Sequence, residues 1–178
     1  MSRERRPAWI ICVLAMIGVA AMSLAAWVSG LPVVVPSLGA TLVAAAVAPD
    51  APENAPLTIV AGHAIAVAGA LAALAVCGLM GQPSALVVGV TAARMLALPF
   101  ALGLTLLGML LSRRVHTPAG ATALLVALGI LRPGSDVVVL LLAVVYVAAV
   151  IAAFPRIAER LSAGARVTPR RRARASAR

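Results

Sequence analysis

Two histidines and two Gly-Ala-Thr runs are the parts of this sequence whose residue types could do chemistry. His63 and His116 are the only histidines, and imidazole is the side chain that gains or loses a proton near neutral pH. The runs at 39–41 and 120–122 place small residues beside a hydroxyl group, and a proline stands shortly before each. Because proline is tolerated in the first turn of a helix, each run is predicted to lie at a helix start.

A helix start is a natural place for an anion. Its first four N–H groups lack partners within the helix and carry about half a positive charge. Small residues let an ion approach this backbone, and hydroxyl groups can replace its water. If the two starts face one point, they form a small-anion site without a fixed cation. The candidate substrate-binding residues are Ser37, Gly39, Ala40, Thr41, His63, His116, Thr117, Gly120, Ala121 and Thr122. The alternative is that the small residues only allow tight helix packing.

Composition places these residues in a membrane. Of the 178 residues, 63% are apolar and only 11% are charged, whereas a soluble domain has about 25% charged residues. So much apolar surface cannot be hidden in a core this small, so we predict an all-α integral membrane protein. An ionisable residue at membrane depth is a candidate for function. We favour His116 for a proton-linked or gating role; the alternative is a histidine that only hydrogen-bonds a neighbouring helix.

The positive charge is concentrated at the two ends. All 15 basic residues are arginines, three of them within 1–7 and eight after Phe154. Basic flanks mark the cytoplasmic side, so we expect a bacterial cytoplasmic membrane with both termini cytoplasmic, beside anionic lipid headgroups. The basic tail, 156–178, is expected to be mostly disordered. It has no aromatic residue to stack on bases, so nucleic acid is not an expected partner.

Six apolar segments are predicted, two of them short and interrupted by proline. Arg94, in the fourth segment, is expected to snorkel to the outer interface, with attraction of anions at an entrance as the alternative. Asn54 is expected to form part of a polar turn. The six segments are 8–29, 31–48, 57–80, 82–111, 116–131 and 137–154.

The two halves of the chain share a pattern. The Gly-Ala-Thr runs lie 81 residues apart, and Pro52 and Pro133 match at the same offset. We predict two three-segment repeats, about 8–80 and 84–154, inside a transmembrane domain at 8–155. Three segments per repeat make the repeats inverted, as in many transporters. The alternative is four full spans with the two short segments re-entrant.

Four stretches resemble the HPP family of integral membrane proteins, in matching order over roughly residues 10–153. The family motif is His-Pro-Pro before Ala-Gly-Ala, and here it is His116, Thr117 and Pro118. Threonine in place of the middle proline is a departure that puts the local rigidity in doubt. Gly62 and His63 also fit the pattern. The stretches are PSLGAT (36–41), APDAPENAP (48–56), AGH (61–63) and RRVHTPAGATALLVALG (113–129).

The resemblance implies transport, because some family members are associated with nitrite. We therefore expect a channel or secondary transporter for a small monovalent anion, nitrite being the first guess. The alternatives are a non-transporting membrane scaffold and a carrier of another small solute. No nucleophile elbow, metal-ligand spacing or nucleotide-binding loop is present, so neither catalysis nor a metal or other cofactor is expected. A homo-oligomer is left open.

Overall fold

The computed structural model describes residues 7–31 and 34–175, with side chains as far as Ser162. Over this part the chain is helical and contains no strand, so the predicted all-α class is confirmed. The elements are α1 (Ala8–Ser29), α2 (Pro36–Val47), the short 3-10 helix η1 (Pro52–Asn54), α3 (Pro56–Val76), α4 (Ala85–Val88), α5 (Ala92–Ser112), α6 (Ala119–Ala127) and α7 (Ser135–Ala175).

Four of the described helices are long and apolar enough to cross a bilayer. They are α1, α3, α5 and the Ser135–Ser162 part of α7. The helices α2 and α6 have 12 and 9 residues, whereas a full span needs about 20. Large apolar side chains such as Trp27 and Leu111 lie exposed on the outside, as expected of a surface that contacts lipid. The chain is therefore an integral membrane protein.

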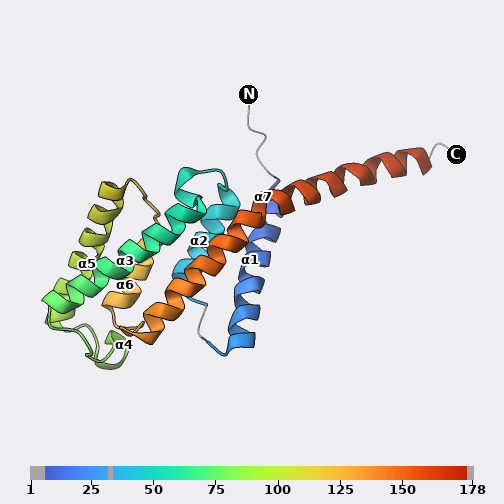
Figure 1. The fold of residues 1–178 in the computed structure, drawn as a ribbon. Coiled ribbons are helices and arrows are strands. Elements are labelled where there is room, and N and C mark those ends of the chain that lie inside the picture. The colour runs from blue at the N-terminus through green and yellow to red at the C-terminus, as the bar shows by residue number, and fades with distance from the viewer. Residues whose placement is uncertain (1–6, 32–33, 176–178) are drawn as a thin grey trace.

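The two ends of the bundle are defined by the loops that meet there. Successive helices reverse direction, so the loops at 48–55 and 113–118 lie together at one end, where α1 also begins (Figure 1). A contact of 2.8 Å between His116 Nδ1 and the Glu53 carbonyl joins these loops. We call this the Glu53 end. At the opposite end, the Arg94 end, the backbone N–H of Ala85 donates to Leu128 at 2.9 Å.

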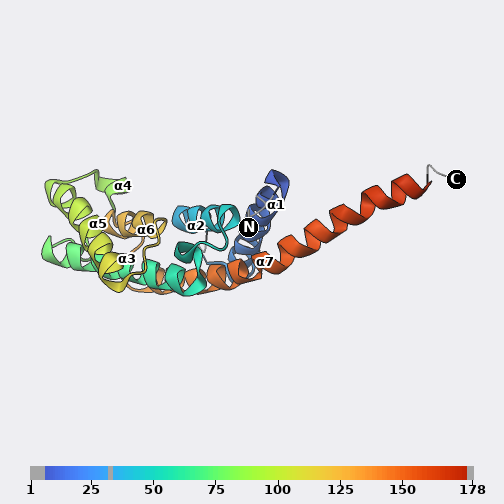
Figure 2. The same ribbon diagram turned by 90° about the horizontal axis from the view of Figure 1, so that it is seen from above.

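The short helices lie across the middle of the molecule. Figure 2 shows α2 and α6 next to each other, between α1 on one side and α5 on the other. The helix α3 packs against α5, α6 and α7. Small residues bring these backbones close: a Cβ on Gly69 would lie 2.9 Å from Thr105 Oγ1 and 3.0 Å from Thr105 N. Close backbone approach of this kind is the usual packing of membrane helices.

The C-terminal end of α2 is held by Asn54. Its Nδ2 donates to the carbonyls of Ala44 at 3.0 Å and Ala48 at 2.8 Å. The last carbonyls of a helix have no partner within the helix, and at membrane depth they need one. Asn54 is 2% exposed, so its role is larger than the turn formation that the sequence suggested.

The end of α6 is held in the same way by Arg94. Its Nη1 donates to Ala127 O and its Nη2 to Pro83 O, each at 2.6 Å. The side chain is 1% exposed, so the prediction that Arg94 snorkels to the interface is wrong. A cation is favourable at this position because the C-terminal end of a helix carries partial negative charge.

Two parts of the chain differ from the sequence interpretation. Residues 77–91, assigned largely to apolar segments, form turns around α4, since Gly78 and Gly81 take the left-handed conformation with φ of 66° and 75°. The tail, expected to be disordered from residue 156, continues α7 as helix to Ala175 and extends away from the bundle (Figure 1). Alanine and arginine, which dominate the tail, are both good helix formers.

Candidate functional site

Five buried polar side chains meet where the first turns of α2 and α6 overlap. They come from four separate parts of the chain, namely α2, α3, the loop before α6, and α6 itself. Each is fully buried, with 0% of its surface exposed, and each is among the candidates that the sequence named. We call this group the polar cluster, and its members are Ser37, Thr41, His63, His116 and Thr122.

His63 bridges the two threonines of the Gly-Ala-Thr runs. Its Nε2 lies 3.1 Å from Thr41 Oγ1, and its Nδ1 lies 2.8 Å from Thr122 Oγ1. The two threonines occupy matching positions in the two Gly-Ala-Thr runs, 81 residues apart. One imidazole on α3 therefore joins the two short helices through equivalent hydroxyl groups.

The cluster extends in both directions from this bridge. Toward the Glu53 end, Thr41 Oγ1 lies 3.0 Å from His116 Nε2, and His116 Nδ1 lies 2.8 Å from the Glu53 carbonyl oxygen. Toward the start of α2, Thr122 Oγ1 lies 2.9 Å from Ser37 Oγ. The two imidazole rings are near each other, with 5.3 Å between their centroids. The contacts form one continuous line through the interior.

The Glu53 carbonyl determines which nitrogen of a neutral His116 carries hydrogen. A carbonyl oxygen can only accept, so Nδ1 of His116 donates and Nε2 must accept. Nε2 faces the hydroxyl of Thr41 at 3.0 Å. This hydroxyl has one hydrogen, which it donates to the Ser37 carbonyl oxygen at 2.9 Å.

The hydroxyl groups decide the direction of the remaining contacts. Thr122 donates to Ser37, so its oxygen accepts from Nδ1–H of His63. A neutral His63 then has its lone pair on Nε2, which faces Thr41 as Nε2 of His116 does. A proton added to either Nε2 could therefore donate to the Thr41 oxygen.

The remaining predicted residues lie outside the cluster. Ala40, Thr117 and Ala121 are exposed, and Gly39 and Gly120 are partly exposed. A Cβ on Gly39 would have no neighbour within 4 Å, and one on Gly120 would meet only a leucine side-chain atom at 3.5 Å. Tight packing against the described residues therefore does not explain Gly120, and the approach of an ion to this glycine stays a prediction.

The close approach occurs at Gly62 instead. A Cβ on Gly62 would lie 2.7 Å from the Cβ of His116, too near for any side chain. Glycine therefore lets His116 pack directly against α3 and reach Thr41. The sequence pointed to Gly62 only as the neighbour of His63, and the Glu53 carbonyl gave no signal because every residue has one.

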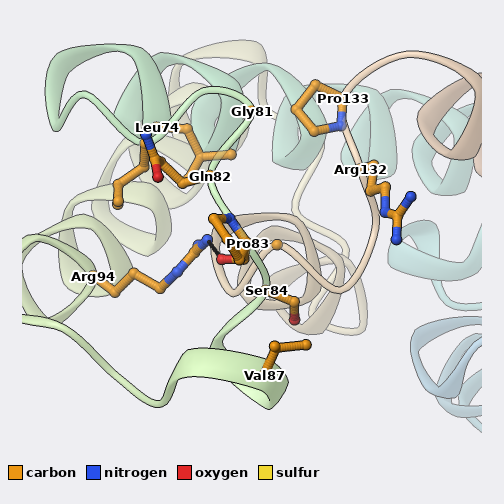
Figure 3. A pocket seen from close by; sticks show the side chains of 11 residues that line it. Leu74, Gly81, Gln82, Pro83, Ser84, Val87, Arg94, Arg132 and Pro133 are labelled. Atoms are coloured by element: carbon orange, nitrogen blue, oxygen red, sulfur yellow. Dashed lines mark hydrogen bonds between the residues drawn. The ribbon is translucent and has the colours of Figure 1, made fainter.

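Each end of the bundle contains a cavity. A cavity of about 420 Å³ at the Glu53 end is lined by Glu53, Thr58 and Arg113, among others. A cavity of about 440 Å³ at the Arg94 end is lined by Arg94 and Arg132, among others (Figure 3). One residue of each cavity also helps to position the polar cluster. The Glu53 carbonyl oxygen contacts His116, and Arg94 hydrogen-bonds the C-terminal end of α6.

No metal centre is evident in the described part of the chain, where no group of three or more His, Cys, Asp or Glu side chains is placed to hold an ion. The comparisons with curated proteins and with solved structures found no match. The model of one family, described as the HPP transmembrane region, matches residues 2–167 and so includes every member of the polar cluster. The chain therefore belongs to the HPP family of transmembrane proteins.

Proposed function

We propose that this protein is a channel or secondary transporter for a small monovalent anion, with nitrite as the first substrate to test. The observation that carries the proposal is the overlap of two helix starts at a buried polar cluster. The contact of 2.9 Å between Ser37 and Thr122 joins the first turns of α2 and α6. Both helices lead away from this contact toward opposite ends (Figure 1).

Two helix starts at one point favour a negative ion. Each contributes partial positive charge and N–H groups. No carboxylate belongs to the polar cluster, so nothing within it repels an anion. The hydroxyl groups of Ser37, Thr41 and Thr122 now satisfy one another and the imidazoles, and each can turn to donate to a passing ion in place of its water.

The cavities at the two ends support a path through the cluster. From the Glu53 end, the path leads past the Glu53 carbonyl to His116. From the Arg94 end, it leads along α6, whose last turn Arg94 holds. On the proposed path the polar cluster lies between the two cavities, so passage of an ion requires the hydrogen bonds of the cluster to exchange.

We further propose that α2 and α6, with the chain that leads into them, complete six crossings as two inverted repeats, with both termini cytoplasmic. The matching contacts of Thr41 and Thr122 with His63 favour this plan. Superposing 8–80 on 84–154 should give a rotation axis in the membrane plane; an axis along the membrane normal would instead support four full spans with the two short segments re-entrant. A reporter fused after residue 178 that reads as external would refute the orientation.

The transport proposal is tested by flux into liposomes. Purified protein is reconstituted, and uptake of nitrite, nitrate and chloride is compared with protein-free vesicles. Uptake above the protein-free rate supports the proposal, and the order of rates gives the preferred ion. Uptake equal to the protein-free rate for all three, with correctly inserted protein, would leave the non-transporting scaffold as the better function.

A further inference from the structure

We propose that the cavity at the Arg94 end is a binding site for a small oxyanion, held by the guanidinium group of Arg94. The anion is either free in solution or the phosphate of a lipid headgroup, because the two present the same chemistry. We also propose that the transported ion enters through this site, and that part rests on the proposed function. Binding itself does not, and it can be measured without transport.

The positive charge of Arg94 is buried without a counter-ion among the described residues. Arg94 is 1% exposed, and a guanidinium group stays protonated in proteins. Buried charges are normally paired, because removing a lone charge from water is costly. Among the described residues, no carboxylate forms an ion pair with Arg94; its partners are the two carbonyl groups of Ala127 and Pro83. Carbonyl dipoles offset the charge only in part.

Three N–H donors of the Arg94 guanidinium group have no hydrogen-bond partner among the described residues. A guanidinium group has five N–H donors, and the two carbonyl contacts occupy two of them. Both contacts fix the plane of the group, so the other three N–H groups have a defined direction. Planar, fixed donors of this kind suit the oxygens of an oxyanion.

The cavity beside Arg94 is large enough for an anion. The cavity of about 440 Å³ is many times the roughly 30 Å³ that one water occupies, so a hydrated anion or a phosphate group fits. Its lining includes a second cation, Arg132, and the neutral polar residues Gln82 and Ser84, and it contains no acidic residue. Figure 3 shows the Arg94 side chain extended toward Pro83, with Ser84 nearby.

Gly129 supports the same assignment. It lines the cavity and has a φ of 71°. A Cβ at this position would lie 2.8 Å from Arg94 Nη2. Glycine therefore lets the chain pack directly against the guanidinium group, and a side chain here would displace that group or fill part of the cavity.

The experiment measures anion binding to the full-length protein in a zwitterionic detergent. The probes are sodium nitrite, nitrate and phosphate, with gluconate keeping the ionic strength constant. Binding is followed by the rise of the unfolding midpoint with probe concentration and by calorimetric titration. We expect Arg94→Gln to weaken binding about tenfold to hundredfold, as expected for the loss of a charged hydrogen-bond donor, and Arg132→Gln to weaken it less.

Controls separate the site from general charge effects. Arg114→Gln removes one positive charge at the Glu53 end and should leave the affinity unchanged. Arg94 also holds α6, so weaker binding by Arg94→Gln counts only if that variant is folded; Arg132→Gln, on an exposed residue, carries the test if it is not. An affinity that is unchanged in Arg132→Gln and in every folded Arg94 variant, or reduced equally in Arg114→Gln, overturns the proposal.

The source of the anion is resolved in nanodiscs. Phosphatidylcholine discs are compared with discs that also contain phosphatidylglycerol, each with and without the soluble probes. Stabilisation by phosphatidylglycerol that Arg132→Gln reduces assigns a lipid headgroup, and stabilisation by the soluble probes assigns a free anion. Stabilisation by neither overturns the proposal. Binding without liposome flux would keep this site and refute transport, whereas flux without binding would do the reverse.

Discussion

The hydroxyl oxygen of Thr41 lies 3.0 Å from Nε2 of His116, although 75 residues separate them in the chain. The same oxygen lies 3.1 Å from Nε2 of His63. Thr41 is therefore the only link between the two imidazoles in the line of contacts described here. Both imidazoles contact this one hydroxyl group of α2, so its removal should affect stability and transport together.

Thr41→Val removes the link while keeping the shape of the side chain. Two buried imidazole nitrogens then lose a partner, and an unsatisfied buried group costs about 1–3 kcal/mol. We expect a lower unfolding midpoint in detergent and a loss of most anion flux. Thr105→Val is the matched control, since the Thr105 hydroxyl bonds only Ala101 of its own helix at 2.8 Å. Equal flux in the two variants would contradict a role for Thr41.

The tautomers of the histidines give a prediction that does not depend on transport. In the neutral protein, both histidines should carry their hydrogen on Nδ1. Nδ1 of His116 faces the Glu53 carbonyl oxygen, and Nδ1 of His63 faces Thr122, whose hydroxyl donates to Ser37. Nitrogen-15 NMR of histidine-labelled protein separates the two tautomers by chemical shift. Finding the hydrogen on Nε2 at either residue would contradict these directions.

The members of the polar cluster could be predicted because they are rare. Two histidines and two proline-led Gly-Ala-Thr runs stand out in a chain that is 63% apolar, and membrane helices leave few other places for polar groups. The all-α class and the four long spans follow from hydropathy in the same way. The partners of Thr41 could not be predicted, because they depend on how α2 and α6 overlap in space.

Arg94 and Asn54 show what hydropathy cannot reveal. Both were assigned by local rules, snorkelling for the arginine and a turn for the asparagine. In the structure, each holds the C-terminal carbonyls of a short helix. The need for such a donor arises only because α2 and α6 end inside the bundle, which depends on tertiary structure. The sequence also could not show that Ala40, Thr117 and Ala121 are exposed, because exposure depends on how the short helices pack.

Gly62→Ala should be far more harmful than Gly120→Ala. The first places a Cβ 2.7 Å from the Cβ of His116, so His116 or α3 must move; the second meets only a leucine side-chain atom at 3.5 Å. We expect Gly62→Ala to destabilise the protein by about 1–3 kcal/mol, as overpacking does. Gly120→Ala should be neutral or slightly stabilising, because alanine is the better helix former. Thermal unfolding of both variants makes the comparison, and a reversed order would contradict the packing at Gly62.

Asn54→Asp should destabilise the end of α2. The change replaces an amide donor by a carboxylate that repels the carbonyls of Ala44 and Ala48. Asn54→Ala, which leaves those carbonyls without this donor, should cost about 1–3 kcal/mol, and Asn54→Asp should cost more. The unfolding midpoint measures both. If Asn54→Asp were as stable as the unchanged protein, the amide would not be what holds α2.

His116→Gln should leave flux that no longer responds to protonation of an imidazole at this position. Glutamine keeps a polar side chain that can donate but cannot be protonated, whereas His116→Ala should lose either the pH dependence or the flux itself, with insertion intact. Because Glu53 also lines the path, Glu53→Gln is the necessary comparison: it removes a titratable carboxylate but keeps the backbone carbonyl that contacts His116. Liposome flux measured across pH for the three variants separates the two groups. If Glu53→Gln abolished the pH response and His116→Gln preserved it, the proton-linked role would belong to the carboxylate and the assignment to His116 would be wrong.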